Sequence, residues 1–107
     1  MTTVAELVVS AEPEAWRAVG FTVDDDVVRL GGINVRLTGG DAGLTEWVLA
    51  DAPDDSVAMI DGLRTSHADA PSPRETNHPN GVASIDHVVV YTPHLERTCA
   101  ALSLIHI

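Results

Sequence analysis

The stretch VVRLGGINVRL, residues 27–37, carries the clearest structural signal in the sequence. Two adjacent glycines separate two runs rich in valine, leucine and isoleucine, which is the pattern of a β-hairpin with a two-residue turn. A turn at Gly31 and Gly32 places apolar residues of the two strands opposite each other, on one face of the hairpin. The facing pairs are Leu30 with Ile33 and Val28 with Val35. The polar residues of the other face are Arg29, Asn34 and Arg36.

The sequence on both sides of this hairpin predicts further elements. Residues 5–10, AELVVS, form a short valine-rich run suited to a strand, and residues 13–20 have Pro13 where a first helical turn accepts it and Gly20 where a helix ends. After a turn at TGGDAG, residues 44–50 predict another strand. The order β-α-β-β-β predicts an α+β fold with a first module at residues 1–60.

Residues 61–81 have a different composition. Prolines stand among Ser, Thr, Asn and Asp without a hydrophobic period, so we expect a Pro-rich linker. Residues 57–60, VAMI, fit either a turn of helix or a strand. His67 and His78 lie in the linker, and we expect both to be solvated. The prolines of the linker are Pro71, Pro73 and Pro79.

After Gly81 the sequence restates the start of the first module. SIDHVVVYT repeats the valine-rich strand and TPHLERTCAAL repeats the start of a helix. Thr92 is available as the N-cap, with Pro93 at the first helical position. We therefore expect the first β-α pair of a second module at residues 82–101.

The stretch HPNGVASIDHVVVYTPHLERTCAAL, residues 78–102, resembles the opening of a module of the vicinal oxygen chelate superfamily, the glyoxalase, bleomycin-resistance and extradiol dioxygenase group. The resemblance is specific over residues 81–102 and weaker over residues 5–50. It implies paired βαβββ modules whose sheets curve around a cleft. In metal-using members the His of the first strand is a ligand, which implies His87 in this chain. Glu6 stands in that place in the first module, and His94 replaces an Asp at the start of the helix.

The resemblance leaves two functions open. In the first, the parent protein is a glyoxalase-like lyase, isomerase or dioxygenase in which one divalent ion, Zn, Ni, Mn or Fe, acts as a Lewis acid with His87 as a ligand. In the second, it is a protein of the bleomycin-resistance type that sequesters a small molecule without metal. One His is not a metal site, so the first function places the ion in the complete parent, and we expect none in this fragment. The catalytic residues stay unknown, and the sequence predicts no cofactor-binding residue.

The last six residues, LSLIHI, are the residues that the codons CTG TCT CTT ATA CAC ATC would encode. That DNA resembles the transposon end used as an adapter in sequencing libraries. We therefore expect residues 102–107 to be an adapter artefact. The second module is then truncated, its remaining ligands lie beyond the truncation, and the fragment is inactive.

The charge of the chain excludes two classes of partner. Sixteen Asp and Glu against six Lys and Arg give a net charge of −10, which repels nucleic acid and anionic membranes. Cys99 is the single cysteine and cannot form an internal disulfide. No leader or spanning segment is apparent, so we expect a cytoplasmic protein. The predicted partner is a small-molecule ligand or substrate, and a homodimer stays open.

Other polar and aromatic residues have simpler explanations than a site. The run Asp24, Asp25 and Asp26 lacks the spacing and the glycine of a calcium loop, so we expect a solvated turn. We expect Trp16 and Trp47 to be core or cleft-wall residues. We expect Cys99 to contribute to packing.

Overall fold

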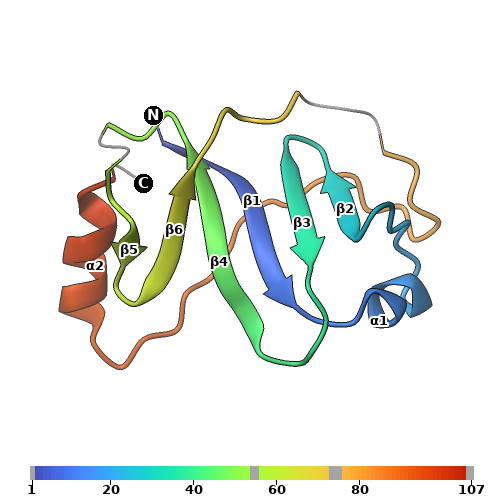
Figure 1. Cartoon of the computed structure of the whole chain (residues 1–107), viewed down its shortest axis with the longest axis horizontal. Helices are drawn as coiled ribbons and strands as arrows, with labels where there is room; N and C mark the ends of the chain where they lie inside the picture. The colour runs from blue at the N-terminus through green and yellow to red at the C-terminus, as the bar shows by residue number, and fades with distance from the viewer. Residues whose placement is uncertain (1, 54–55, 73–75, 106–107) are drawn as a thin grey trace.

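The hairpin predicted around Gly31 and Gly32 is present in a computed structural model of the chain (Figure 1). Its strands, β2 (Val27–Leu30) and β3 (Ile33–Leu37), pair antiparallel. Gly31 has a φ of 66°, which glycine adopts without strain. The predicted register is confirmed, with the facing pairs Leu30 with Ile33 and Val28 with Val35.

The centre of the six-stranded sheet is the antiparallel pair of β1 (Thr3–Ser10) and β4 (Gly43–Ala50). The strand order is β2-β3-β1-β4-β6-β5. β3 runs parallel to β1 and β6 runs parallel to β4, so each central strand has a hairpin on its outer side. The sheet is therefore mixed, and the α+β class is confirmed.

The helix α1 (Pro13–Ala18) connects β1 to β2 and lies at the β2 end of the sheet (Figure 1). Pro13 occupies the start of the helix as predicted, because its missing N–H is not needed there. Gly20 follows the helix with a φ of 96°. The order of elements over residues 3–50 matches the predicted β-α-β-β-β order.

A hairpin that was not predicted from the sequence crosses the boundary between the first module and the predicted linker. β5 (Met59–Ile60) and β6 (Leu63–His67) pair antiparallel around Asp61 and Gly62, whose φ angles are 47° and 87°. Asp-Gly between apolar residues is a strong signal for a two-residue turn with two positive φ angles. Residues 59–60 are thus a strand, and the expectation of an irregular linker was wrong over residues 63–67.

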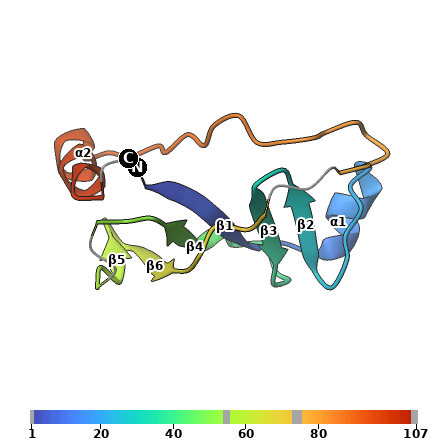
Figure 2. The ribbon, with the colours of Figure 1, turned by 90° about the horizontal axis from the view of Figure 1, so that it is seen from above.

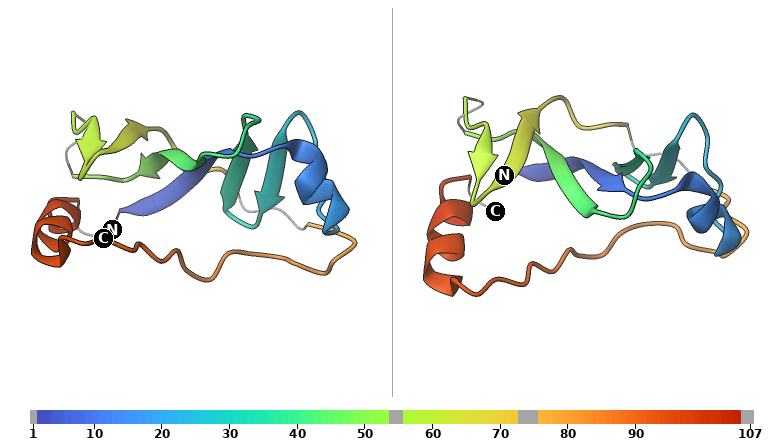
Figure 3. Two further views of the ribbon diagram at one scale, coloured as in Figure 1. Left: turned by 90° about the horizontal axis from the view of Figure 1, so that it is seen from below. Right: turned by 60° about the horizontal axis from the view of Figure 1, so that its bottom comes forward.

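The strand predicted in SIDHVVVYT, residues 84–92, is not formed. In the part of the chain that the structure describes, this segment is extended but pairs with no strand. Figures 2 and 3 show it crossing one face of the sheet, from the α1 end to the α2 end. A valine-rich run favours extended backbone, but a strand also requires a neighbouring edge that binds its N–H and C=O groups. We call residues 86–94, between Ile85 and α2, the strap.

The predicted second helix is present as α2 (Leu95–Ser103), beside β5 (Figure 1). Its N-cap residue is His94, so Pro93 precedes the cap and does not occupy the first helical position. Thr92 is not the N-cap, but its hydroxyl accepts a hydrogen bond from the His94 N–H at 3.1 Å. The cap position was therefore wrong by two residues.

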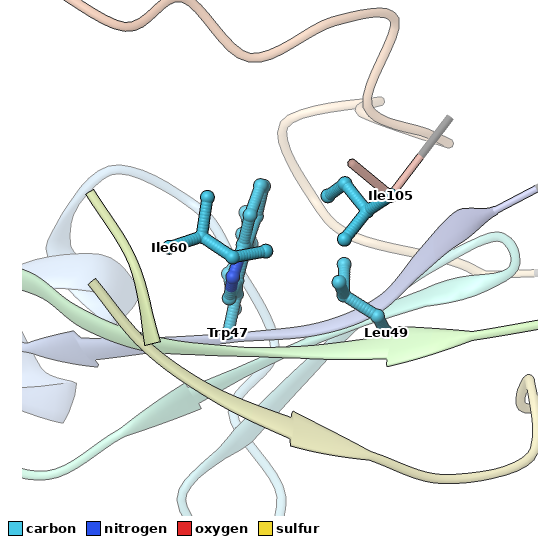
Figure 4. Packing of buried hydrophobic residues seen from close by; sticks show 5 residues of the cluster. Trp47, Leu49, Ile60 and Ile105 are labelled. Carbon is cyan, nitrogen blue, oxygen red and sulfur yellow. The ribbon is translucent and has the colours of Figure 1, made fainter. Parts of the chain in front are cut away.

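Buried apolar residues form two clusters. One lies beneath α2 and contains Leu7, Trp47, Leu49, Ile60 and Ile105 (Figure 4). The other lies at the α1 end and contains Val23, Val28, Leu30, Val35 and Leu37. Ile85 packs against both clusters and so holds the start of the strap against the sheet.

The tail expected to be an adapter artefact takes part in the first cluster. Ile105 is 1% exposed and lies against Leu49 (Figure 4). Burial of an apolar side chain does not depend on the origin of its codon. The artefact hypothesis therefore stays a prediction, as does the division into units at residues 1–60, 61–81, 82–101 and 102–107.

The structure describes residues 2–53, 56–72 and 76–105. Pro73 of the predicted linker, and His106 and Ile107 of the predicted artefact, lie outside these ranges. Within them, neither helix has the length and apolar character needed to cross a membrane.

Candidate functional site

A groove of about 650 Å³ lies between the sheet and the extended segment that crosses it. The start of β1, the β2–β3 turn and Trp47 of β4 form its sheet side. Ile85 and part of the strap form the other side. Aliphatic and aromatic side chains supply most of its wall, among them Val4, Ile33, Trp47, Ile85, Val88 and Val90.

His87, the predicted metal ligand, lies at the edge of this groove together with Asp86. The His87 side chain is 72% exposed, and its Nδ1 lies 2.8 Å from Oδ2 of Asp86. The two residues are adjacent on the strap, whose irregular backbone lets both line the groove. Regular strand geometry would have placed them on opposite sides.

Trp47 forms part of the groove wall and of the core, as the sequence predicted for a core or cleft-wall residue. It is 5% exposed, and its indole N–H donates a hydrogen bond of 2.8 Å to Oγ1 of Thr65 on β6. This bond satisfies the one polar atom of the ring, so its apolar surface is free to line the groove. Trp16 packs elsewhere, 5.0 Å from the ring of Phe21.

His78 was predicted to be solvated, and that prediction was wrong. It is 8% exposed, with its ring edge-on to Phe21 at 5.4 Å. Its Nδ1 accepts a hydrogen bond from the Thr22 N–H at 2.9 Å, and its Nε2 lies 2.7 Å from the Arg29 carbonyl oxygen. Because a carbonyl only accepts, Nε2 carries the proton. His78 therefore joins the segment before the strap to the α1 end of the sheet.

His67, at the end of β6, was also predicted to be solvated, and this prediction was wrong as well. Its Nε2 lies 2.6 Å from the Val57 carbonyl oxygen, so Nε2 is the donor. Its Nδ1 is buried without a hydrogen-bond partner among the described residues. The ring borders a hollow of about 420 Å³ together with Asp51 and Asp69. This hollow is separate from the groove, so His67 and His87 do not belong to one site.

Asp61, in the β5–β6 turn, joins the sheet to α2. Its Oδ1 accepts a hydrogen bond from Nε of Arg97 at 2.7 Å, and its Oδ2 accepts one from the Thr98 hydroxyl. The Thr98 hydrogen bond is the largest of the effects that hold the pKa of Asp61 below its ordinary value; Arg97 and the nearby His94 act in the same direction. We call the contact of Asp61 with Arg97 and Thr98 the latch.

The sequence contained a signal for the turn of the latch but none for its partners. Asp61-Gly62 is a recognisable hairpin turn. Arg97 and Thr98 lie more than thirty residues away, at separations of 36 and 37. No local pattern reports a contact at that distance along the chain.

The other candidates are not brought together. Asp24, Asp25 and Asp26 are exposed in a turn, as predicted. Cys99 is exposed, so its predicted role in packing was wrong; it lies on the outer side of α2. Among the described residues no group of three or more His, Cys, Asp or Glu side chains is placed to hold a metal ion.

Comparisons with protein-family models, with curated proteins and with solved structures found no match for this chain.

Proposed function

We propose that the chain binds a small, largely apolar molecule in the groove between the sheet and the strap. The observation that carries this proposal is the groove itself. Its volume of about 650 Å³ falls within the range of small-molecule sites, which are typically a few hundred to about a thousand Å³. Like such sites, it has an apolar wall with a few polar groups, here Asp86 and His87 at one edge.

The charge of the groove favours a neutral or positively charged ligand. The described residues that line it include Asp86 but no Lys or Arg. The chain as a whole carries a formal charge of −10. A carboxylate or phosphate ligand would meet repulsion without a fixed positive partner.

The resemblance of residues 81–102 to the vicinal oxygen chelate superfamily supports the same class of function. Members of that superfamily hold small molecules in a cleft. Binding without a metal would correspond to sequestration by a protein of the bleomycin-resistance type. Membership in the superfamily and the glyoxalase-like module remain part of the proposal. So does the cytoplasmic location.

A metal-dependent activity is the second candidate, because the pairing of His87 with Asp86 has the form of a carboxylate that orients a metal-binding imidazole. The donor set among the described residues does not fit a complete site, since no group of three ligands is present there. This candidate therefore concerns a longer protein containing the chain, with Zn, Ni, Mn or Fe. In such a protein His87→Ala should lower metal affinity, as measured by metal analysis after dialysis.

Two adjacent valines test the groove. Val90 lines it, whereas Val89, similarly exposed at 58% against 51%, is not among its lining residues. We expect Val90→Asp to weaken the binding of the neutral apolar dye Nile red by roughly tenfold or more, because a charge in an apolar wall must be desolvated by the ligand. Val89→Asp should leave the affinity within about twofold. Binding is measured by dye fluorescence.

The same titration can reject the proposal. If the unmodified chain does not bind the dye, the groove is not an apolar binding site. Equal loss of affinity in both variants would show that the dye binds elsewhere on the valine-rich segment.

A further inference from the structure

The strap is held to the sheet only at its two ends. Within the described part of the chain, no hydrogen bond joins residues 85–91 to the sheet. Asp86, His87, Val88 and Val90 line the groove, so this loosely held segment forms one of its walls. Figure 2 shows the segment lying along the face of the sheet between its two ends. Motion of the strap therefore changes access to the groove.

The segment that leads into the strap at the α1 end, residues 78–85, is held by neutral hydrogen bonds. Besides those of His78, the Asn80 N–H donates to the Gly20 carbonyl oxygen at 3.1 Å, and the Asn80 Nδ2 donates to the Val19 carbonyl oxygen at 3.1 Å. Gly20 allows this close approach, since a Cβ there would lie 2.8 Å from Cβ of Asn80. Val82 and Ile85 then pack against the core. This end is fixed by burial and by several independent bonds.

The end nearer to α2 is held by the latch and by apolar contacts of Ala101, Leu102 and Ile105 with the first cluster. Among secondary-structure elements α2 contacts chiefly β5, and its polar attachment is the bond of Asp61 to Arg97 and Thr98. The Thr98 hydroxyl oxygen also lies 2.9 Å from that of Thr92, at the end of the strap. Because the single Thr98 proton goes to Asp61, Thr92 is the donor in this pair. The latch thus connects the sheet, α2 and the strap.

A small cavity lies between the latch and the groove. It measures about 70 Å³ and is bordered by Asp61 and Thr98 of the latch. It shares Trp47, Val90 and Leu102 with the groove wall. The space beneath α2 is therefore incompletely filled on the side that faces the groove.

We propose that α2 and the strap form a gate of the groove, and that the Asp61 latch holds this gate closed. The inference rests on the proposed function, since a gate requires a ligand. Release of the latch removes the polar attachment of α2 and loosens its hold on the strap, while the bonds of His78 and Asn80 keep the segment before the strap in place. Ligand and latch are then reciprocally coupled: a bound ligand stabilises the closed gate, and a released latch speeds the loss of ligand.

The main test is Asp61→Asn in the full chain, with Asp51→Asn as the matched control. Both aspartates have a positive φ, 47° at Asp61 and 59° at Asp51, which asparagine also adopts, so both turns are kept. Among the described residues Asp51 has no ion-pair partner. Thr98→Val is a second variant that removes the hydroxyl from the other side of the latch at nearly constant volume.

Two quantities are measured at neutral pH: amide hydrogen exchange of residues 95–103, and the rate at which Nile red dissociates after dilution. We expect Asp61→Asn and Thr98→Val to accelerate both by roughly tenfold, the factor for weakening a charge-assisted hydrogen bond. Asp51→Asn should leave both within about twofold.

The outcomes separate the gate from the function on which it rests. Faster exchange in α2 with unchanged dye release overturns the gate and leaves the binding proposal standing. Unchanged exchange in both latch variants overturns the role of the latch. If the unmodified chain binds no dye, the proposed function fails and the gate with it.

Discussion

Val35 and Arg36 are neighbours on β3 whose side chains lie in opposite environments. Val35 is 2% exposed in the α1-end core, whereas Arg36 is exposed and lies 3.1 Å from Oε1 of Glu6. We expect Val35→Asp to lower the free energy of unfolding by roughly 3 kcal/mol or more, because the carboxylate is buried without a partner. Arg36→Asp should cost much less, about 1 kcal/mol, since Arg36 is exposed and the change removes its ion pair with Glu6 without burying a new charge.

Urea denaturation followed by circular dichroism measures both values. Equal losses of stability in the two variants would contradict the assignment of faces in the hairpin. The assignment was available from the sequence, because the Gly31-Gly32 turn fixes the register and the register fixes the faces.

Asp61 makes the docking of α2 dependent on pH. The pKa of Asp61 is lowered in the folded chain, first by the hydrogen bond from Thr98 and then by Arg97, so the carboxylate form is favoured there. Its contribution to stability is present above the unfolded pKa, about 3.9, and is lost as the pH falls through the lower folded value. We expect amide exchange in α2, corrected for its intrinsic pH dependence, to rise below about pH 4.

Asp61→Asn is the control for this titration. The variant should show fast corrected exchange in α2 already at neutral pH and no further acid-induced step in α2. A step of equal size in the variant would assign the acid sensitivity to another group.

The histidines show where prediction from single residues ends. His78 and His67 lie in a polar, proline-rich stretch, which favours solvated side chains. The partners of the His78 ring nitrogens, Thr22 and Arg29, are 56 and 49 residues away. Local composition does not encode such contacts, so the burial of His78 could not be predicted.

At the scale of elements, the strap and β1 contrast although both are valine-rich. β1 pairs with β3 on one side and β4 on the other, while the strap pairs with neither edge of the sheet. We expect amides of β1, β3 and β4 to exchange only when the whole chain unfolds. Amides of residues 86–92 should exchange almost as fast as in an unfolded chain. Hydrogen exchange with mass spectrometry measures both. Slow exchange in the strap of a monomer would contradict the unpaired backbone.

The sequence predicted best the elements whose ends are set by nearby turn or cap residues. Gly31-Gly32 defined β2 and β3, and Pro13 with Gly20 defined α1. The strand predicted at residues 84–92 did not form, because side-chain propensity reports the preferred backbone and not the presence of a partner edge. The β5–β6 hairpin was missed because β5 has two residues, too few to show a hydrophobic period.

At the scale of the whole molecule, the α+β class followed from the order of elements, but the sheet did not. The parallel pairs β1 with β3 and β4 with β6 bring together strands separated by other elements. Such pairings depend on how whole hairpins pack against each other, and no turn sequence predicts them. The groove was unpredictable for the same reason, since its two sides come from opposite ends of the chain. Of its residues, Trp47 was predicted from the sequence to be a core or cleft-wall residue and His87 to be a metal ligand.

The strap has one more consequence, which concerns effective concentration. α2 docks as part of the same chain, so its local concentration at the sheet is on the order of millimolar. Tyr91, the single tyrosine, lies in the middle of the strap and is 94% exposed. Chymotrypsin cleaves after exposed tyrosines. We expect one cut after Tyr91 to turn the docking of α2 into a bimolecular event, so that the fragment starting at Thr92 separates from the sheet at micromolar protein in native gel filtration. Tyr91→Ser should resist that cut and keep α2. If the cleaved fragment stays bound, its own contacts hold α2 without help from the strap.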